Sequence, residues 1–151
     1  MVEGFIKTIQ YLDILPIWTD YLWPNRTSPI EPNSGMLFLE GHTIKNMFMT
    51  PTFFGYYIND KLIGVNSGHM CLDKTYRSRG LYVFPEYRGE GIGRILLKAT
   101  VDQGFLENAN FVWSYPRYTS WKTYENTGFI ICSPWYDTEQ GQNAFCAIGR
   151  S

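Results

Sequence analysis

Three alternating glycines, Gly89, Gly91 and Gly93, follow an apolar run and a proline, and precede an apolar pattern with helical spacing. Glycine has no Cβ, so these positions permit a tight turn and a close approach of a ligand to the main chain. The unpaired amides of a first helical turn, together with the helix dipole, favour an anion. Arg88 and Arg94 flank the turn and add positive charge. The segment therefore predicts a site for a pyrophosphate group.

The residues that follow the glycines exclude two common phosphate-binding motifs. A P-loop needs Lys-Ser or Lys-Thr after its last glycine, and Gly93 is followed by Arg94 instead. The dinucleotide fingerprint G-x-G-x-x-G needs a further glycine where this chain has Leu96. The pattern that fits is Arg-x-x-Gly-x-Gly over Arg88, Gly91 and Gly93, directly after Leu-x-Val-x-Pro. This order closely resembles the acetyl-CoA motif of the GNAT superfamily of N-acetyltransferases. The alternative is a glycine-rich turn without a ligand.

A second motif lies further along the chain, in the order that the same superfamily has. Residues Tyr124–Phe129 read Tyr-Glu-Asn-Thr-Gly-Phe and resemble the superfamily's Tyr-x-x-x-Gly-Phe. The resemblance implies that Tyr124 protonates the departing thiolate of coenzyme A, which a phenol with a pKa of about 10 can do. The alternative is a tyrosine that packs its ring on the sheet.

The resemblance also implies which residues bind acetyl-CoA and how the transfer proceeds. The strand triplet Leu81–Val83 lines the pantetheine arm. A backbone N–H of this triplet holds the oxyanion that develops when an uncharged amine attacks the thioester. Residues 89–94 hold the pyrophosphate. The cofactor-binding residues predicted in this way are Leu81, Tyr82, Val83, Arg88, Gly89, Glu90, Gly91, Ile92, Gly93 and Arg94.

The general base is missing from the positions where many relatives have it. They place Glu or His two or four residues before the strand triplet, and this chain has Arg79 and Arg77 there. Arginine stays protonated in proteins, so neither can accept a proton. His69 is the best titratable candidate, because the pKa of histidine is ordinarily near neutrality. Its alternative is a histidine without a catalytic role. Tyr82, Asp73, a bound water or an amine that arrives deprotonated are further options.

The two arginines suggest a site for the acceptor substrate. Arg77 and Arg79 are two residues apart on an expected strand and therefore share one face. Their guanidinium groups suit a carboxylate or a phosphate on the acceptor through bidentate hydrogen bonds. The alternatives are solvated charges at a strand edge or contacts with coenzyme A. Relatives often have an asparagine seven residues before the motif tyrosine, where this chain has Arg117.

The chain length of 151 residues predicts one domain, residues 1–151. The order of hydrophobic patterns predicts an α/β (α+β) fold. The resemblance implies a mixed, mostly antiparallel central sheet with a splayed strand pair and flanking helices. Strands are expected at 4–10, 52–58, 61–70, 79–84, 111–115, 129–132 and 143–149. Helices are expected after Asp13 as the cap, at 44–49, at 92–105 and at 119–126.

Composition and charge narrow the class of partners. The formal charge is −1, so we expect no nucleic-acid partner and no attraction to anionic membranes. No apolar run approaches ~18 residues, so no membrane span is expected. Three cysteines and two histidines without paired spacing predict no metal site and reduced thiols in the cytoplasm. Aromatic residues make up 17% of the chain, and we expect them in the core, with an aromatic ligand wall as the alternative.

We therefore predict an N-acetyltransferase that moves an acetyl group from acetyl-CoA to a primary amine by direct attack. The acceptor is a small molecule, an amino-acid derivative or a peptide. The alternative is a catalytically silent domain that binds or senses acyl-CoA, which the missing base favours and Tyr124 disfavours. The first helix, its loop and the terminal hairpin shape the acceptor site in this architecture, and here they carry no recognisable pattern. A homodimer is a candidate assembly, with Pro134–Tyr136 as a contact.

Overall fold

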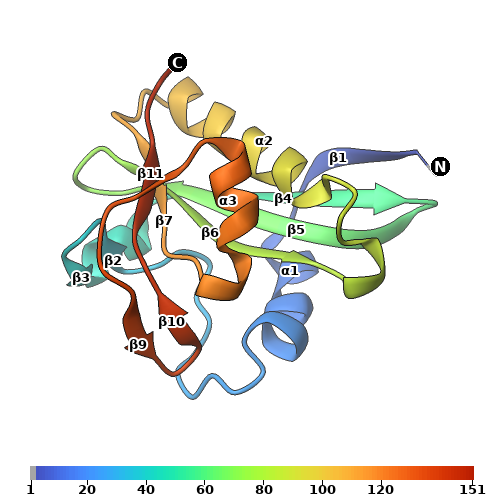
Figure 1. Cartoon of the computed structure of the whole chain (residues 1–151), viewed down its shortest axis with the longest axis horizontal. Coiled ribbons are helices and arrows are strands. Elements are labelled where there is room, and N and C mark those ends of the chain that lie inside the picture. The colour runs from blue at the N-terminus through green and yellow to red at the C-terminus, as the bar shows by residue number, and fades with distance from the viewer. Residues whose placement is uncertain (1–2) are drawn as a thin grey trace.

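The computed structural model describes residues 3–151, and a seven-stranded sheet forms the centre of the molecule (Figure 1). In spatial order the strands are β1 (Gly4–Ile9), β4 (Thr52–Ile58), β5 (Lys61–Met70), β6 (Tyr76–Val83), β7 (Val112–Ser114), β11 (Cys146–Ile148) and β8 (Ile130–Ile131). Neighbouring strands pair antiparallel except β6 and β7, which are parallel. The predicted α/β (α+β) fold with a mixed, mostly antiparallel sheet is confirmed.

Helices flank this sheet, and two small hairpins lie beside it. The helices are α1 (Tyr11–Ile17), which continues into a π-helical turn at Trp18–Leu22, α2 (Ile92–Leu106) and α3 (Trp121–Thr127), with short 3-10 turns at Ile44–Phe48, Pro85–Tyr87 and Tyr118–Ser120. The hairpins are β2 (Met36–Leu37) with β3 (Gly41–His42), and β9 (Tyr136–Thr138) with β10 (Gly141–Asn143). Sequence analysis missed both hairpins, because neither has the alternating apolar pattern that predicts a strand.

Two boundaries differ from the sequence-based expectation. β6 begins at Tyr76, whereas this strand was expected to begin at residue 79. This part of the strand is buried despite its polar residues, so it lacks the exposure that a polar turn has. The cap of α1 is Gln10 rather than Asp13. The carboxylate of Asp13 accepts the N–H of Gln10 at 2.9 Å, which is one half of a capping box.

The long helix α2 packs its apolar face on β5 and β6 (Figure 1). Helical spacing predicted this face, and most of its residues are buried. The buried ones are Ile92, Leu96, Leu97 and Val101. The aromatic residues contribute strongly to the interior, since Trp18, Tyr76 and Trp113 are fully buried. This agrees with the core interpretation of the high aromatic content.

The parallel strands β6 and β7 separate soon after they meet. Only Tyr76 with Val112 and Arg77 with Trp113 are paired. β7 ends at Ser114, whose hydroxyl donates to the carbonyl of Ser78 at 2.8 Å, while β6 continues to Val83. The remaining part of β6 therefore has no strand on this side. This is the expected splayed pair, and it leaves one edge of β6 open to a ligand.

A β-bulge shapes β6 at Gly80. The pairing with β5 moves from Ser67 opposite Arg79 to Val65 opposite Tyr82, so the bulge lies between these two pairs. Gly80 has a φ of +83°, which favours glycine. The indole N–H of Trp18 donates to the Gly80 carbonyl at 2.9 Å. This hydrogen bond holds the π-helical turn Trp18–Leu22 beside β6, the strand that carries the Leu81–Val83 triplet.

We expect Gly80→Ala to destabilise the protein by about 2–4 kcal/mol. An alanine at this φ is strained, and its Cβ would lie 2.3 Å from Nε1 of Trp18. The free energy of unfolding in urea measures the loss. Gly149→Ala is the control, because a Cβ there meets nothing within 4 Å. Equal stabilities of the two variants would show that the bulge does not depend on glycine.

Candidate active site

The glycine turn connects β6 to α2 and is shaped by backbone conformations that glycine favours. The chain leaves β6 at Val83 and passes through the 3-10 turn Pro85–Tyr87. Gly89 and Gly91 both have a φ of +84°, and Gly91 caps α2 in the left-handed conformation. A Cβ built on either residue meets no atom within 4 Å. The turn is therefore open on the side where these two side chains would stand.

The amides of this turn are available to a ligand. Within residues 3–151, no backbone acceptor is recorded for the N–H groups from Gly89 to Arg94. The pattern of helical bonds starts at Ile95, whose N–H donates to the Gly91 carbonyl at 3.1 Å. Unpaired N–H groups at a helix start attract anions, and the helix dipole adds to this effect. The backbone geometry of the turn is therefore compatible with the predicted anion site.

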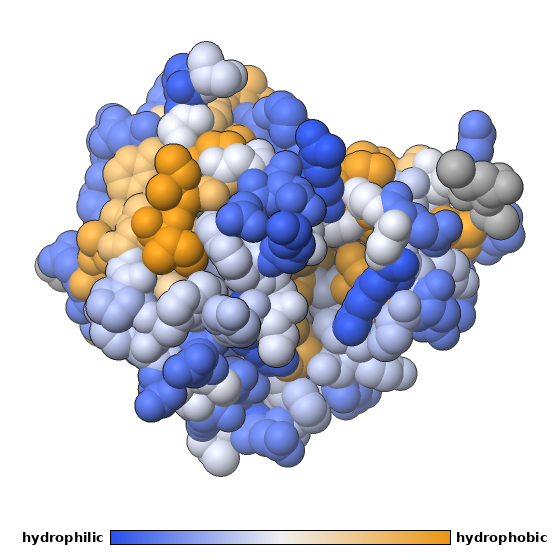
Figure 2. All heavy atoms as spheres, in the orientation of Figure 1, coloured by the Kyte–Doolittle hydropathy of each residue, from blue (hydrophilic) through white to orange (hydrophobic). Residues whose placement is uncertain are grey.

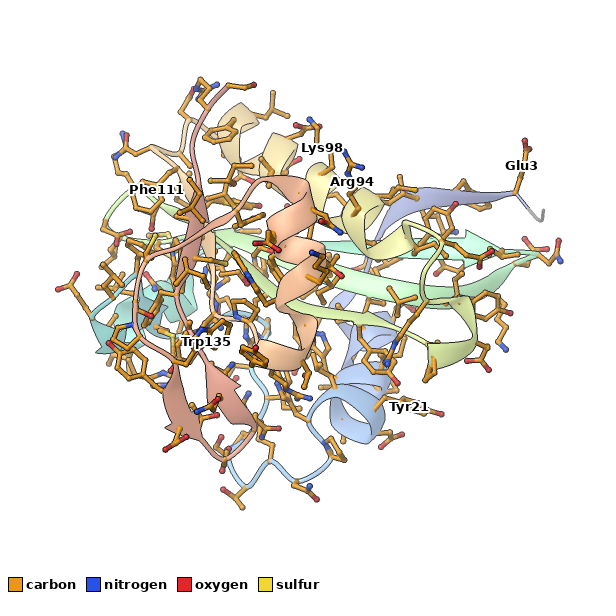
Figure 3. All side chains as sticks on the ribbon, viewed as in Figure 1. Glu3, Tyr21, Arg94, Lys98, Phe111 and Trp135 are labelled. Atoms are coloured by element: carbon orange, nitrogen blue, oxygen red, sulfur yellow. The ribbon has the colours of Figure 1, made fainter. Side chains whose placement is uncertain are left out.

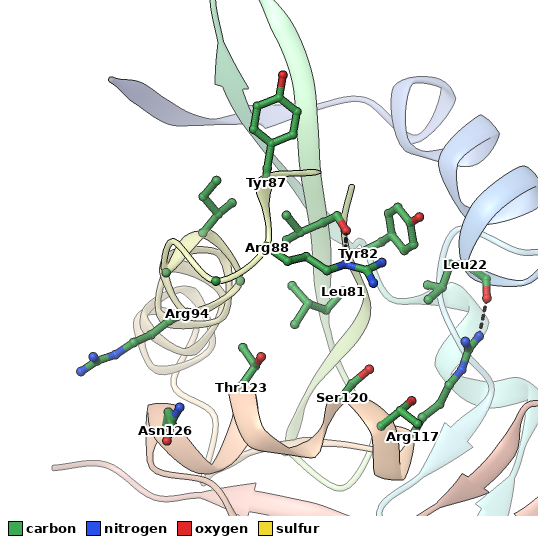
Figure 4. A pocket seen from close by; sticks show the side chains of 16 residues that line it. Leu22, Leu81, Tyr82, Tyr87, Arg88, Arg94, Arg117, Ser120, Thr123 and Asn126 are labelled. Carbon is green, nitrogen blue, oxygen red and sulfur yellow. Dashed lines mark hydrogen bonds between the residues drawn. The ribbon is translucent and has the colours of Figure 1, made fainter. Parts of the chain in front are cut away.

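A cavity of about 680 Å³ lies between this turn, β6 and α3, and we name it the turn cavity (Figure 4). The strand triplet Leu81–Val83 lines one side of it. The other lining residues are Leu22, Tyr87, Arg88, Gly89, Gly91, Ile92, Gly93, Arg94, Arg117, Thr119, Ser120, Thr123 and Asn126. The structure therefore brings the triplet and the glycine turn together around one space.

The charged residues of the motif differ in their orientation. Arg88 donates from Nε to the Val83 carbonyl at 2.7 Å, and its guanidinium lies over the ring of Tyr82, 5.2 Å from the centroid. Figure 4 shows Arg94 directed away from Arg88, and Figure 3 shows it on the outer side of α2 together with Lys98. Glu90 is exposed and does not line the turn cavity, so only its backbone remains a candidate for ligand contact.

Tyr124 lies on α3 and is 4% exposed, with its ring edge-on to Phe129. Burial raises the pKa of the phenol, and a hydrogen bond with the Ser114 side chain opposes this shift. The charges of Arg77 and Arg117 also lower the pKa. The net rise keeps the phenol protonated at neutral pH, as a proton donor must be. Tyr124 lies behind the lining of the turn cavity rather than in it.

His69 is fully buried and has partners on both ring nitrogens. Its Nε2 accepts the N–H of Ser34 at 3.1 Å, and its Nδ1 lies 3.3 Å from the Met70 carbonyl. Burial, followed by the charge of Arg77, lowers the pKa of His69 to about 3. The ring lines neither cavity described in this section. The structure therefore does not support His69 as the general base, because the lone pair of Nε2 already accepts the N–H of Ser34 and is not free to accept a proton.

Neutral burial of His69 makes stability depend on pH. The unfolded chain binds a proton at this ring below its ordinary pKa of 6.5, whereas the folded chain does so only near 3. The stabilisation is complete above pH 6.5 and is lost as the pH falls toward 3. We expect the free energy of unfolding to fall with decreasing pH more steeply than in His69→Gln, by up to about 1.4 kcal/mol per pH unit. Urea unfolding at pH 4.5, 5.5 and 6.5 measures both slopes.

The more exposed His42 provides a matched control for this prediction. Burial lowers its pKa as well, yet the side chain retains access to solvent. We expect His42→Gln to change the slope less than His69→Gln does. Identical slopes for the wild type and His69→Gln would mean that the buried ring does not control acid stability.

A second cavity, of about 800 Å³, contains the two strand arginines, and we name it the arginine cavity. Its walls come from the loop after the first helix, from residues 33–47, from β6 and from the β9–β10 hairpin. Arg77 and Arg79 both line it and are 9% and 4% exposed. The expectation of solvated charges at a strand edge is therefore wrong, and both arginines face one space as the strand period predicts.

Arg117 lies between the two cavities. It lines the turn cavity, and its Nη2 donates to the carbonyl of Leu22 and, at 3.3 Å, to Oε1 of Gln140. Gln140 lines the arginine cavity. Arg117 therefore links the linings of the two cavities.

Sequence reasoning missed several residues that line the turn cavity. Ser120, Thr123 and Asn126 recur at intervals of three, which places them on one face of α3. This polar stripe was a usable signal. Leu22 had no local signal, because it reaches the cavity only through the packing of the first helix against β6.

The comparison with protein families matches residues 16–129 to the acetyltransferase (GNAT) family. The chain belongs to the GNAT acetyltransferase family. The matched segment includes both the glycine turn and the Tyr-x-x-x-Gly-Phe motif, so the two resemblances seen in the sequence are confirmed at family level. No curated protein matches this GNAT chain in sequence.

Solved structures share the GNAT fold at low sequence identity. Ard1 from Thermoplasma volcanium has a TM-score of 0.68 and 17% identity, with 98% of each chain covered. The ribosomal-protein-S18-alanine N-acetyltransferase from Escherichia coli has a TM-score of 0.65 and 19% identity, over 97% of this chain and 94% of that one. A structure from Bacillus anthracis str. Ames, solved in complex with acetyl coenzyme A, has a TM-score of 0.66 and 12% identity over 99% of both chains.

Two features of the described residues concern membranes and metal ions as partners. Within residues 3–151, no helix has both the length and the apolar character that a membrane span requires. The same residues contain no group of three or more His, Cys, Asp or Glu side chains placed to hold a metal ion. The three cysteines, Cys71, Cys132 and Cys146, are free thiols.

Proposed function

We propose that this GNAT protein transfers an acetyl group from acetyl-CoA to a primary amine by direct attack. One observation carries the proposal: the unpaired amides of the glycine turn and the open edge of β6 line the same cavity. An anion cradle beside an unpaired strand edge suits a ligand with a pyrophosphate at one end and an amide-containing arm at the other. Acetyl-CoA has this chemistry and supplies the thioester.

The residues of the turn cavity then take distinct roles. The amides of residues 89–94 bind the pyrophosphate, with Arg88 and Arg94 adding positive charge. The triplet Leu81–Val83 lines the pantetheine arm, and one of its N–H groups stabilises the oxyanion as the amine attacks. Glu90 contributes its backbone alone, since its side chain lies outside the cavity.

Tyr124 supplies the proton that the departing thiolate needs. Its raised pKa keeps the phenol protonated at neutral pH, so the hydroxyl can donate a hydrogen bond and then its proton to the sulfur as the C–S bond breaks, and solvent reprotonates the phenol before the next turnover. Because the phenol lies behind the cavity lining, we expect side chains of α3 to shift when the ligand binds. Both cavities contribute a charge that lowers the pKa of this phenol, Arg77 from the arginine cavity and Arg117 from the turn cavity.

The amine has to lose a proton, and the turn cavity offers no group for it. None of the described residues that line this cavity is Asp, Glu or His. The arginine cavity contains Glu31 and His42. Burial and the neighbouring arginines lower the pKa of His42, so its ring is uncharged at neutral pH and able to accept a proton. We therefore place the deprotonation of the amine on the acceptor side, with His42 as the candidate base.

The absence of acidic groups and histidines from the turn cavity also favours a second candidate, a catalytically silent domain that binds acyl-CoA. Thermal unfolding with increasing acetyl-CoA tests binding, because a ligand of the folded state raises Tm with its concentration. Release of free thiol across a panel of amines then separates the candidates. We expect both a raised Tm and thiol release with at least one amine. A raised Tm without release from any amine identifies the silent domain.

The remaining predictions about the whole protein stay proposals. A single domain over residues 1–151 is supported by one sheet that contains strands from both ends of the described chain. The free cysteines support a reducing compartment such as the cytoplasm.

A homodimer would use the sheet edge at β8, where Ile130 is 70% exposed. Figure 2 shows hydrophobic residues gathered on this part of the surface. Trp135 of the alternative contact instead packs on Tyr118.

A further inference from the structure

The arginine cavity contains two buried arginines that form no ion pair with a carboxylate. Arg77 and Arg79 are both more than nine-tenths buried. The ion pairs of the described residues lie on the exposed faces of α2 and α3, so neither arginine has a carboxylate oxygen within 4.0 Å. A buried charge without a counter-ion is costly, by several kcal/mol after relaxation. Each arginine also lowers the pKa of its neighbours, and Arg77 is the main charge that lowers the pKa of Arg79.

The two arginines differ in whether their buried N–H groups find hydrogen-bond acceptors within the protein. Arg79 donates to the carbonyl of Glu31 at 2.8 Å, and its guanidinium lies 4.9 Å from the centroid of Trp18. Arg77 donates from Nη1 to the hydroxyl of Ser34 at 2.5 Å and lies 5.1 Å from the centroid of Trp113. Its Nε is buried and has no acceptor. Arg77 is thus the cation with an unused hydrogen-bond donor.

A second unused donor lines the same cavity. The Nε2 of Gln140 is buried without an acceptor, while its Oε1 accepts from Arg117, which fixes the orientation of the amide. The third such atom among the described residues is an oxygen of Asn66, which lines neither cavity. An unsatisfied buried donor costs about 1–3 kcal/mol. A ligand oxygen that reached Arg77 and Gln140 after a small rotation of their side chains would remove this cost.

The charge balance of the cavity indicates how many negative charges the ligand carries. Arg26 joins Arg77 and Arg79 in the lining, opposed by Glu31 and Glu139. With the histidine uncharged, one positive charge remains. A single carboxylate neutralises it and offers two acceptor oxygens to the two unused donors. A phosphate, with a charge near −2, would leave the cavity negative.

We propose that the acetyl acceptor is an amine that also carries a carboxylate, which binds beside Arg77 in the arginine cavity. This inference rests on the proposed function, because it places the acceptor next to Tyr124. The carboxylate occupies the arginine side, and the amine points toward the boundary with the turn cavity. Amino acids and acidic peptides belong to this class, whereas aminoglycoside-type and polyamine acceptors do not.

Matched pairs of amines test the proposal. Each amino acid of a panel is offered to the full chain as the free acid and as its carboxamide, with phosphoethanolamine and spermidine as further arms. Thiol release from acetyl-CoA gives kcat/KM for each amine. We expect kcat/KM to be at least about tenfold higher for the acid than for the amide of the best acceptor, as one charged hydrogen bond predicts. We expect this preference to fall below about threefold in Arg77→Gln, through the acceptor KM rather than the KM of acetyl-CoA.

Control variants keep the test independent of folding. Lys122→Gln on the exposed face of α3 removes one positive charge outside both cavities, and should retain the full preference. If Arg77→Gln no longer binds acetyl-CoA, Gln140→Leu replaces it, because Gln140 lies in the β9–β10 hairpin outside the main sheet. It too should reduce the preference for the acid. Arg79→Ala should raise the acceptor KM far more than the acetyl-CoA KM.

The outcomes separate this inference from the proposed function. Equal turnover of acids and amides, or a preference for spermidine or phosphoethanolamine, overturns the carboxylate site and leaves N-acetyl transfer in place. If the preference for acids survives in both Arg77→Gln and Gln140→Leu, the carboxylate binds elsewhere in the protein. This result also overturns the inference. Binding of acetyl-CoA without turnover of any amine contradicts the proposed function, and the inference falls with it.

Discussion

We expect Tyr124→Phe to lower kcat at least about 100-fold, with the KM of acetyl-CoA within about twofold of the wild type. Phenylalanine keeps the ring that packs against Phe129 and removes the hydroxyl near Ser114. The fold and the ligand contacts should remain, while the thiolate leaves without a proton donor. Steady-state rates of thiol release with a saturating amine measure the change.

Tyr76→Phe is the matched control for this variant. Tyr76 is also buried, and its hydroxyl donates at 2.9 Å to Glu107, which caps the C-terminal end of α2, opposite the end that follows the glycine turn. Removing it costs stability but touches neither cavity. We expect its kcat to stay within about twofold of the wild type. A Tyr124→Phe variant as active as Tyr76→Phe would remove Tyr124 from the chemistry.

Gly91→Asp is expected to weaken acetyl-CoA binding about 100-fold, and Gly91→Asn about tenfold. Aspartate and asparagine both tolerate the left-handed conformation that Gly91 adopts, so the two variants differ mainly in charge. The carboxylate would stand in the open space of the turn, where the pyrophosphate is proposed to bind. Isothermal titration with acetyl-CoA gives Kd for both.

Gly141→Asp distinguishes loss of the ligand site from general strain. Gly141 has a φ of +103° and open space around its Cβ, but it lies in the β9–β10 hairpin, outside the turn cavity. We expect its Kd to equal that of the wild type. Similar losses at Gly91 and Gly141 would point to a global effect and would count against the anion cradle.

Local patterns predicted the parts of the fold that depend on neighbours in sequence. The glycine turn and the apolar face of α2 follow from spacing and residue type alone. These features repeat every two or 3.6 residues or need a glycine, so a short window contains their signal. The resemblance to the GNAT superfamily, rather than such a pattern, singled out the triplet Leu81–Val83, which lines the turn cavity.

Contacts between distant segments could not be predicted in this way. His69 was chosen for its ordinary pKa, but the loop that contains Ser34 folds over it and excludes water. The burial of Arg77 and Arg79 depends on Trp113, Trp18 and that same loop, so the strand begins at Tyr76 and not at residue 79 as expected. The proposed acceptor site is built largely from such distant contacts, and apart from Arg77 and Arg79 its lining residues had no signal in the sequence.

The central claim is that the amides of the glycine turn bind the pyrophosphate of acetyl-CoA. Selective 15N-glycine labelling tests it directly, because amide shifts during titration report contact with the ligand. We expect acetyl-CoA to shift Gly89, Gly91 and Gly93 at saturation, with Gly141 and Gly149 unchanged. Saturable binding of acetyl-CoA that leaves the amides of Gly89, Gly91 and Gly93 unshifted would contradict the account.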